Sequence, residues 1–432
     1  MLATLVAPAR RKRVLSVASG LYAGGDERRL LTLAKYIDRD AFDHSIVCIR
    51  RETQELGYQR GTFRAEYEET DSRIVDLELD VEAMRALQRH PLSFVRRGTT
   101  ALWRSLSAIC RIVRSERIDV IDAHVGLGNR LGITAGLLTR TPTLVTVYNQ
   151  TEHRHGALAY LSYQLMLRGA SGVVTDDDWT RKTIEEWMLL PPRRMFVIPS
   201  SMLPPQPTRD PQLVRREIGL PNDPKARVIG MVANLLPFKG QSTFLEAASR
   251  IAPLYPKCIF LIAGFTRSEA PQSYIQSLWD RATELGIADR VRIVSYHGHI
   301  GDVWQLIDIH VHPSMKESAA LAIIESMSLR KPLVATDVGA TRSLVIGEYT
   351  GLIVPPAHPG ELASAVLRLL DNPGFAEALG NAAFERYCRL YSKPESMVRR
   401  MEDAFHEVAG VDRLKDVSRS GSLRLSGSDE RA

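Results

Sequence analysis

The sequence predicts two α/β domains, each a doubly wound, Rossmann-like parallel sheet, facing each other across a cleft. Strand-like and helix-like apolar runs alternate along most of the 432 residues, which is typical of parallel sheets covered by helices on both faces. The length suits two domains of ordinary size. A proline-rich stretch at 199–225 interrupts the alternation at mid-chain and has the composition of a linker.

The first domain is expected over 1–203 and the second over 204–392. Strand-like runs of the first domain lie at 13–19, 44–50, 118–124, 143–148, 172–177 and 195–200, with helix-like runs at 26–37 and 128–139. Strand-like runs of the second lie at 227–234, 259–264, 290–295, 308–313, 333–338 and 352–356, with helix-like runs at 241–252, 273–285, 302–307, 320–329 and 361–371. A helix at about 393–410 should pack back on the first domain. The Ser-, Arg- and Gly-rich tail at 411–432 is expected to be disordered.

The composition is that of a globular protein, with 44% apolar and 25% charged residues. The four cysteines have no paired spacing, which favours a reducing cytosol over a disulfide framework or a CxxC metal site. No apolar run reaches the roughly 18 residues that span a bilayer. The charges near the N-terminus follow the apolar residues, which is the wrong order for a signal peptide. A cytoplasmic protein is therefore expected.

The formal net charge of +6 is concentrated in one segment. Residues 81–117 contain eight arginines and two glutamates, interleaved with apolar residues. This pattern predicts a basic amphipathic helix that lies on an anionic membrane surface, at the inner face of the cytoplasmic membrane. The alternative is a solvated basic helix packed on its own domain. Nucleic-acid binding is not favoured, because stacking aromatics and a known binding module are missing.

Two glutamates lie eight positions apart: Glu317 follows a strand-like run, and Glu325 lies inside the helix-like run that comes next. The amides of Ser318, Ala319 and Ala320 at that helix start would face a phosphate. Glu325, roughly 9 Å further along the helix axis, could accept hydrogen bonds from a ribose. Glu317 on the loop could reach the group that the diphosphate carries. The alternative is that both are ordinary surface acids.

Three further loops follow predicted strands. Gly24 and Gly25 let the backbone approach a ligand and open a helix, although a plain tight turn would look the same. Lys239 precedes a helix and could neutralise a leaving diphosphate, or be a solvated loop lysine. The third loop gathers polar side chains that suit a hydrogen-bonding wall, a histidine base or a plain surface loop: Tyr148, Asn149, Glu152, His153 and His155.

Two other clusters resemble metal sites but have simpler explanations. Asp176, Asp177 and Asp178 open a helix, where capping and the helix dipole favour acids. His310 and His312 share one face of a strand, but a third zinc ligand is not evident. Metal binding is therefore not expected at either place.

The ordered motifs resemble glycosyltransferase family 4, the retaining nucleotide-sugar transferases of GT-B fold. The resemblance covers roughly 13–410. It rests on VLSVASGLYAGGDE, DVIDAHVGLGNRLG, TLVTVYN, ASGVVTDDD, VIPSSM, VIGMVANLLPFKG, ESAALAIIESMSLRKPLVATDVGATRSLV and YTGLIVPPAHPGELASAVLRLL. The last three motifs, at the family's spacing, are the most specific part.

The resemblance implies roles for the matching residues. Glu325 resembles the ribose-binding glutamate, Glu317 the glutamate near the donor sugar, and Lys239 the lysine that holds the distal phosphate. The donor-contacting turn corresponds to Ser318, Ala319, Ala320 and Leu321, and the first-domain loop facing the diphosphate and acceptor to Gly24 and Gly25. His124 matches a frequent family histidine, and together with Tyr148, Asn149 and His153 it is assigned to the acceptor side.

The chain departs from the family pattern at four places. Asn234 stands where many members have a phosphate-binding arginine. Ser318, Ala319 and Ala320 replace a Gly-Phe-Gly sequence, which alters the expected sugar pocket. Tyr148 replaces the usual histidine, and Ser200 and Ser201 replace an Asn-Gly pair.

The predicted function is transfer of a sugar from a UDP- or GDP-linked donor to a glycan or lipid-linked acceptor, with retention, in cell-envelope polysaccharide or glycoconjugate synthesis. The nucleotide sugar is a co-substrate, and neither a cofactor nor a metal is expected. A non-catalytic nucleotide-sugar-binding protein and a sugar-nucleotide epimerase are the alternatives. Turnover of a donor excludes the first, and acceptor dependence excludes the second.

Overall fold

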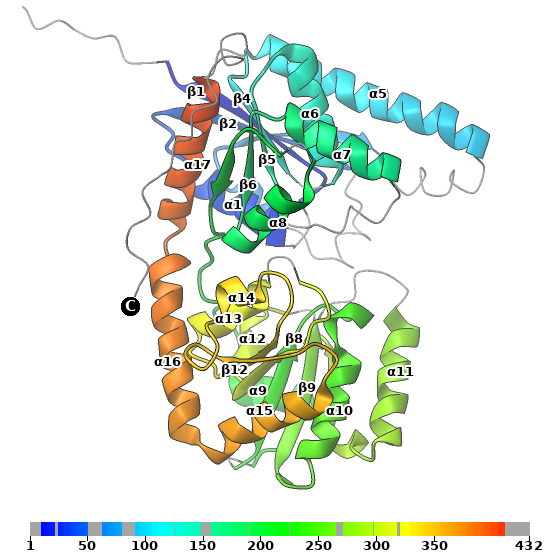
Figure 1. The fold of residues 1–432 in the computed structure, drawn as a ribbon, viewed down its shortest axis with the longest axis vertical. Coiled ribbons are helices and arrows are strands. Elements are labelled where there is room, and N and C mark those ends of the chain that lie inside the picture. The colour runs from blue at the N-terminus through cyan, green and yellow to red at the C-terminus, as the bar shows by residue number, and fades with distance from the viewer. Residues whose placement is uncertain are drawn as a thin grey trace, which may run out of the picture.

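The protein has two α/β units stacked along its long axis, as the computed structural model shows (Figure 1). The structure describes residues 10–21, 25–50, 63–79, 91–124, 126–147, 157–189, 191–223, 225–264, 271–296, 298–317 and 320–410. The predicted tail at 411–432 lies outside these residues.

The first unit is built on a seven-stranded sheet in the order β3-β2-β1-β4-β5-β6-β7. All of its strand pairs are parallel. The strands are β1 (Lys12–Ala18), β2 (Phe42–Arg50), β3 (Arg73–Leu79), β4 (Val120–His124), β5 (Thr143–Thr146), β6 (Gly172–Thr175) and β7 (Met195–Val197). The central strands are almost wholly buried, because helices cover both faces of the sheet.

The helices of the first unit include one from the far end of the chain. They are α1 (Gly25–Tyr36), α3 (Arg64–Glu68), α5 (Pro91–Ser115), α6 (Leu127–Thr139), α7 (Ala157–Gly169), α8 (Asp178–Trp187) and α17 (Pro394–Ala409). α17 buries Met397, Met401 and Phe405 in the same core as Val14 and Leu30. The last helix therefore completes the first core.

The second unit is built on a six-stranded parallel sheet in the order β10-β9-β8-β11-β12-β13. The strands are β8 (Arg227–Val232), β9 (Cys258–Gly264), β10 (Val291–Ser295), β11 (Ile309–His312), β12 (Leu333–Thr336) and β13 (Leu352–Val354). The helices are α9 (Pro211–Glu217), α10 (Gln241–Ile251), α11 (Pro271–Glu284), α12 (Gly301–Trp304), α13 (Leu321–Ser328), α14 (Thr341–Leu344), α15 (Pro359–Asp371) and α16 (Pro373–Leu390), with short 3-10 turns η2 (Pro237–Lys239) and η3 (Ala288–Arg290). Two doubly wound parallel sheets confirm the predicted fold class.

The proline-rich stretch at 199–225 is more ordered than a linker. Asp210 caps α9 by accepting hydrogen bonds from the amides of Gln212 and Leu213, and Val214 of α9 is buried in the second core. Upstream, the amide of Thr208 donates to the buried Asp302 at 2.6 Å. The interpretation of the whole stretch as a linker is therefore wrong for its second half, which belongs to the second unit.

The basic amphipathic segment at 81–117 contains α5, and 81–90 lie outside the described residues. The apolar face of the described part packs on its own domain, where Leu106, Ile109 and Val113 are buried against the first sheet. Trp103 is 63% exposed. In the described part of α5, most of the apolar face is thus covered by the protein itself, as the packed-helix alternative expects.

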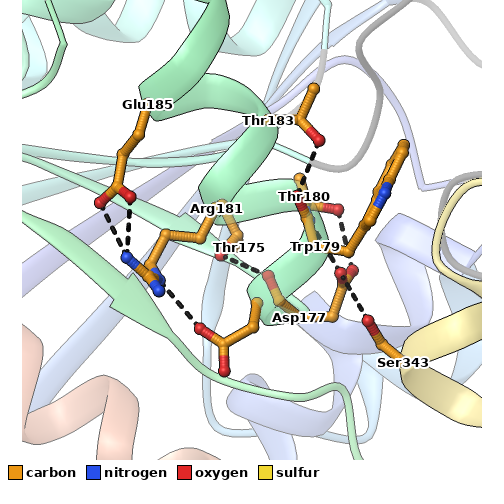
Figure 2. A network of polar contacts seen from close by, with 9 residues as sticks. Thr175, Asp177, Trp179, Thr180, Arg181, Thr183, Glu185 and Ser343 are labelled. Atoms are coloured by element: carbon orange, nitrogen blue, oxygen red, sulfur yellow. Dashed lines mark hydrogen bonds and ion pairs between the residues drawn. The ribbon is translucent and has the colours of Figure 1, made fainter.

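The two units meet at several polar contacts, most of them where the chain passes from one unit to the other. The Tyr391 carbonyl, between α16 and α17, accepts hydrogen bonds from the Ser201 hydroxyl and the Met202 amide. Ser343 of α14 donates to Asp177, which caps α8 in the first unit (Figure 2). The long α16–α17 segment runs beside both units (Figure 1). These contacts fix how the carboxyl edges of the two sheets face each other.

Candidate active site

The predicted site residues follow the strands at which each sheet reverses its order. In the first sheet the reversal lies between β1 and β4, and in the second between β8 and β11. Such switch points form crevices at the carboxyl ends of the strands, where ligands bind. Gly25 begins α1 after β1, and His124 ends β4. Lys239 follows β8, and Glu317 follows β11.

Lys239 and Glu317 form a partly buried ion pair at the second switch point. The Lys239 ammonium lies 2.9 and 2.7 Å from the two Glu317 carboxylate oxygens. Nε2 of His312, the last residue of β11, lies 3.0 Å from the same carboxylate. Burial alone would raise the pKa of Glu317, but His312 and Lys239 outweigh it and hold that pKa well below its usual range. Glu317 is therefore a carboxylate at neutral pH.

Two glycines let neighbouring loops pack against the segment that carries Glu317: Gly240 lies in the loop of Lys239, and Gly339 in the loop after β12. Gly240 has φ +80°, and a Cβ there would lie 1.9 Å from the Pro313 carbonyl oxygen. Gly339 has φ +51°, and its Cβ would lie 1.9 Å from the carbonyl oxygen of Glu317. A side chain at either position would clash with backbone and strain φ. The ion pair therefore depends on glycine at 240 and 339.

Glu325 is buried in α13 and contacts both units. Its Oε2 accepts a hydrogen bond of 2.9 Å from the indole N–H of Trp304, which is fully buried in α12. Its Oε1 lies 4.0 Å from the guanidinium of Arg28 in α1 of the first unit. Burial raises the pKa of Glu325, and Arg28 and Trp304 offset part of that rise. The Glu325 carboxylate thus contacts one side chain from each unit.

The helix that carries Glu325 begins later than the sequence predicts. α13 starts at Leu321, and Ala320 is its N-cap with φ +39°, ψ +47°. This left-handed conformation is unfavourable for a residue with a Cβ by about 1–2 kcal/mol. Glu325 is the fifth helical residue, so it lies about 6 Å along the axis from the helix start. The predicted separation of roughly 9 Å was therefore too long.

His124 is buried at the first switch point within a chain of polar side chains. Its Nε2 lies 2.6 Å from Asp122 Oδ2, and the Ser16 hydroxyl donates to the same oxygen at 3.1 Å. Ser16 also contacts His44, whose pKa burial lowers to about 3. Nδ1 of His124 is buried, and no described residue forms a hydrogen bond with it. Asp122 therefore fixes the ring and leaves Nδ1 without a partner in the described part of the protein.

Several predicted site residues cannot be placed. Those outside the described residues are Gly24, Tyr148, Asn149, His153, Ser318 and Ala319. Leu321 opens α13 as its first residue, and the Asn234 carbonyl accepts a hydrogen bond from the Gln241 side chain at 2.9 Å. Of the predicted donor-side residues, the structure thus describes Gly25, Asn234, Lys239, Glu317, Ala320, Leu321 and Glu325, and of the predicted acceptor-side residues it describes His124.

The acidic cluster and His310 have structural roles, whereas His312 contacts Glu317. Asp177 caps α8, accepting from the amide and hydroxyl of Thr180 (Figure 2). Asp176 pairs with the buried Arg29. His310 is fully buried, which lowers its pKa well below the usual value. Within the described parts of the chain, no group of three or more His, Cys, Asp or Glu residues could hold a metal ion.

Sequence reasoning missed three residues that contact the two glutamates. His312 was weighed only as a packed strand residue or zinc ligand, yet its position at the end of β11 is a signal for the site. Arg28 lies in the first turn of the helix after the glycine pair, which is a weaker signal. Trp304 carries no usable signal, because its contact with Glu325 joins residues 21 apart through tertiary packing.

Solved structures share this two-domain arrangement. The structure of Anabaena Alr3699/HepE, in complex with UDP and glucose, superposes with a TM-score of 0.72 at 17% identity, covering 92% of this chain and all of that one. The sucrose-phosphate synthase of Thermosynechococcus elongatus gives 0.70 at 19% identity, covering 92% and 99%. Two parallel α/β units with paired switch points define the GT-B class of glycosyltransferase fold.

Family models and sequence relatives cover both units. The chain matches the model "Glycosyl transferase 4-like domain" over residues 24–200 and "Glycosyl transferases group 1" over 215–386. The chain belongs to the GT4-type glycosyltransferases. It is 26% identical to a D-inositol 3-phosphate glycosyltransferase of Thermobispora bispora, over 74% of this chain and 84% of that protein. It is 33% identical to the alpha-D-kanosaminyltransferase of Streptomyces kanamyceticus, over 41% and 45%.

Proposed function

We propose that this glycosyltransferase moves a hexosyl unit from a nucleotide-diphosphate sugar to a glycan or lipid-linked acceptor, with retention of anomeric configuration. The arrangement of Lys239, Glu317 and Glu325 around the second switch point carries this proposal. A cation beside a helix start suits a diphosphate, and a buried carboxylate one turn further suits a ribose. The solved relative that holds UDP and glucose supports a UDP-linked donor.

The chemical step is departure of the nucleoside diphosphate from the anomeric carbon. The bond from that carbon to the phosphate oxygen breaks as the acceptor hydroxyl oxygen bonds to the same face. The acceptor proton passes to an oxygen of the leaving diphosphate, so no dedicated base is required. Lys239 and the amides at the start of α13 stabilise the negative charge that develops on the leaving group. We propose no metal for this step.

A thermal-shift panel of UDP-, GDP- and ADP-sugars tests the donor class. A ligand at a hundred times its Kd stabilises the folded protein by about 2.7 kcal/mol, so the right donor should raise the melting temperature clearly above the others. Release of free nucleoside diphosphate from that donor, with acceptor present, then separates transfer from binding alone. A protein stabilised by none of the donors would contradict the proposal.

We also propose that the acceptor belongs to cell-envelope polysaccharide or glycoconjugate synthesis and that α5 holds the protein on an anionic membrane surface. The exposed side chains of Trp103, Arg104, Arg111 and Arg114 in α5 support this. Among the residues that the structure describes, no helix is long and apolar enough to cross a membrane. Flotation with anionic vesicles tests the attachment: wild-type protein should float and Trp103→Ser should float less, whereas a wild-type protein that stays at the bottom would contradict it.

The activity should fall on the acid side of neutrality as Glu325 takes up a proton. Only the carboxylate accepts two ribose hydrogen bonds, and burial raises its pKa. The pH dependence of kcat/KM reports the pKa values of the free enzyme. The pKa of its acid limb should therefore lie above the usual glutamate range. The sign for stability is opposite: a raised carboxyl pKa favours the folded state at low pH and loses that contribution as pH rises.

Glu325→Gln provides the control for this pH profile. The variant should have a lower kcat/KM at neutral pH and should lose the acid limb that Glu325 produces. An unchanged limb in Glu325→Gln would assign the titration to another group.

A further inference from the structure

Arg28 is a cation from the first unit that reaches the donor carboxylate of the second. It lies in the first turn of α1, and its guanidinium is 4.0 Å from Glu325 Oε1. Its side chain is 35% exposed, and its guanidinium carbon lies 5.5 Å from the centre of the Phe63 ring. Arg28 is therefore held between the two units but is not committed to a buried ion pair.

The other groups at the site leave Arg28 available to a ligand. Glu325 has a closer partner in Trp304, whose indole donates to Oε2 at 2.9 Å. An arginine at 4.0 Å gains modest attraction, because a partly exposed pair at this distance is screened by water. The Arg28–Glu325 contact can therefore exchange for a better one when a ligand brings its own charge and hydroxyls.

The charge balance of the candidate site favours a second cation. Lys239 already contacts both oxygens of Glu317, so its charge is balanced before any ligand binds. A nucleoside diphosphate would add at least two negative charges beside Glu317 and Glu325. Among the described residues, Arg28 is the cation that reaches this carboxylate edge from the opposite unit. Its planar guanidinium suits bidentate contact with phosphate oxygens.

We propose that Arg28 binds the diphosphate of the donor and stabilises it as the leaving group, an inference that rests on the proposed function. The ribose hydroxyls take the Glu325 oxygen that Arg28 contacts in the free protein, and Arg28 turns to the diphosphate. Glu325 lies about 6 Å along α13 from the helix start where the phosphates would bind. A rotation of the long arginine side chain covers such a distance while α1 stays in place.

The proposed exchange gives Arg28 opposite effects on two parts of the ligand, which a plain contact between the units would not do. Arg28 competes with the ribose for Glu325 but assists the diphosphate. Removing Arg28 should therefore weaken binding of the nucleoside diphosphate while leaving binding of the bare nucleoside unchanged or tighter. A residue that only held the two units together would change both affinities in the same direction.

Ligand-observed NMR titrations of full-length Arg28→Met with the nucleoside and the nucleoside diphosphate of the preferred donor test the proposal. The Kd of the diphosphate should rise about ten- to hundred-fold, as loss of a charge-assisted contact implies, and the Kd of the nucleoside should stay level or fall. The diphosphate Kd of Arg28→Lys should lie between the Kd values of Arg28→Met and wild type. Lys35→Met, which removes an exposed cation at the other end of α1, should match wild type.

Two results would overturn the inference. One is a diphosphate Kd in Arg28→Met within threefold of wild type, and the other is equal weakening of both ligands. A wild-type protein that binds no nucleoside diphosphate would instead contradict the proposed function, so the two failures are distinguishable.

Discussion

Replacing Lys239 with methionine should lower donor turnover by about a hundred- to a thousand-fold. This is the usual effect of removing one preorganised group that stabilises developing charge in a transition state. Among the described residues, Lys239 and His312 lie within hydrogen-bond distance of the buried Glu317 carboxylate. The substitution should therefore destabilise the fold as well, by about 1.5 to 3 kcal/mol. Release of nucleoside diphosphate and denaturant unfolding measure the two effects.

A double variant separates catalysis from folding. Lys239→Met with Glu317→Gln removes the unpaired carboxylate, so it should recover much of the lost stability and none of the lost turnover. Lys257→Met is the matched control, because Lys257 is an exposed lysine of the same unit that pairs with Asp223 at 2.8 Å. It should keep wild-type turnover. Near wild-type turnover in Lys239→Met would show that Lys239 does not stabilise the leaving group.

Replacing Arg29 with methionine should destabilise the protein by about 3 to 5 kcal/mol, the range expected when one partner of a buried ion pair is removed. Arg29 is fully buried, pairs with Asp176, and donates to the Ile198 carbonyl at 2.8 Å. Its guanidinium also contacts Met401 of α17 at 3.4 Å. Burial raises the pKa of Asp176, and Arg29 offsets part of that rise. Removing Arg29 would therefore leave a buried carboxyl group without its cation. Urea unfolding measures the loss.

The companion variants for Arg29 are built on the same contacts. Adding Asp176→Asn to Arg29→Met should recover more than half of the lost stability, because it removes the unpaired buried charge. Arg400→Met, which removes an exposed arginine next to Met401, should unfold like wild type. A loss below 1 kcal/mol in Arg29→Met would show that the buried pair does not hold α17 to the first unit.

The sequence predicts the sheets better than it predicts the loops. Buried strands such as β8 and β9 are continuous apolar runs bounded by polar residues, and such runs identify parallel strands directly. β3 was not recognised, because it lies at the sheet edge and its exposed charges break the apolar pattern. α9 was hidden by the prolines around it, although Asp210 and Pro211 form a standard helix start.

The candidate site, like the fold, could be predicted only in part from the sequence. Glu317, Glu325 and Lys239 could be singled out because strand-end loops of parallel sheets face ligands. Their partners were missed. His312 at the end of β11 was a usable signal and Arg28 a weaker one, whereas Trp304 meets Glu325 only through tertiary packing. The left-handed Ala320 was equally hidden, since that conformation is expected for glycine and the sequence has alanine there.

The measurement that tests the account most directly is a proton NMR time course with an α-linked nucleotide sugar and the acceptor. The account predicts that the transferred sugar appears in the α configuration, in step with an equal amount of free nucleoside diphosphate, because the leaving phosphate takes the acceptor proton on the face from which it departs. A product of β configuration, or nucleoside diphosphate released with no sugar joined to the acceptor, would contradict it.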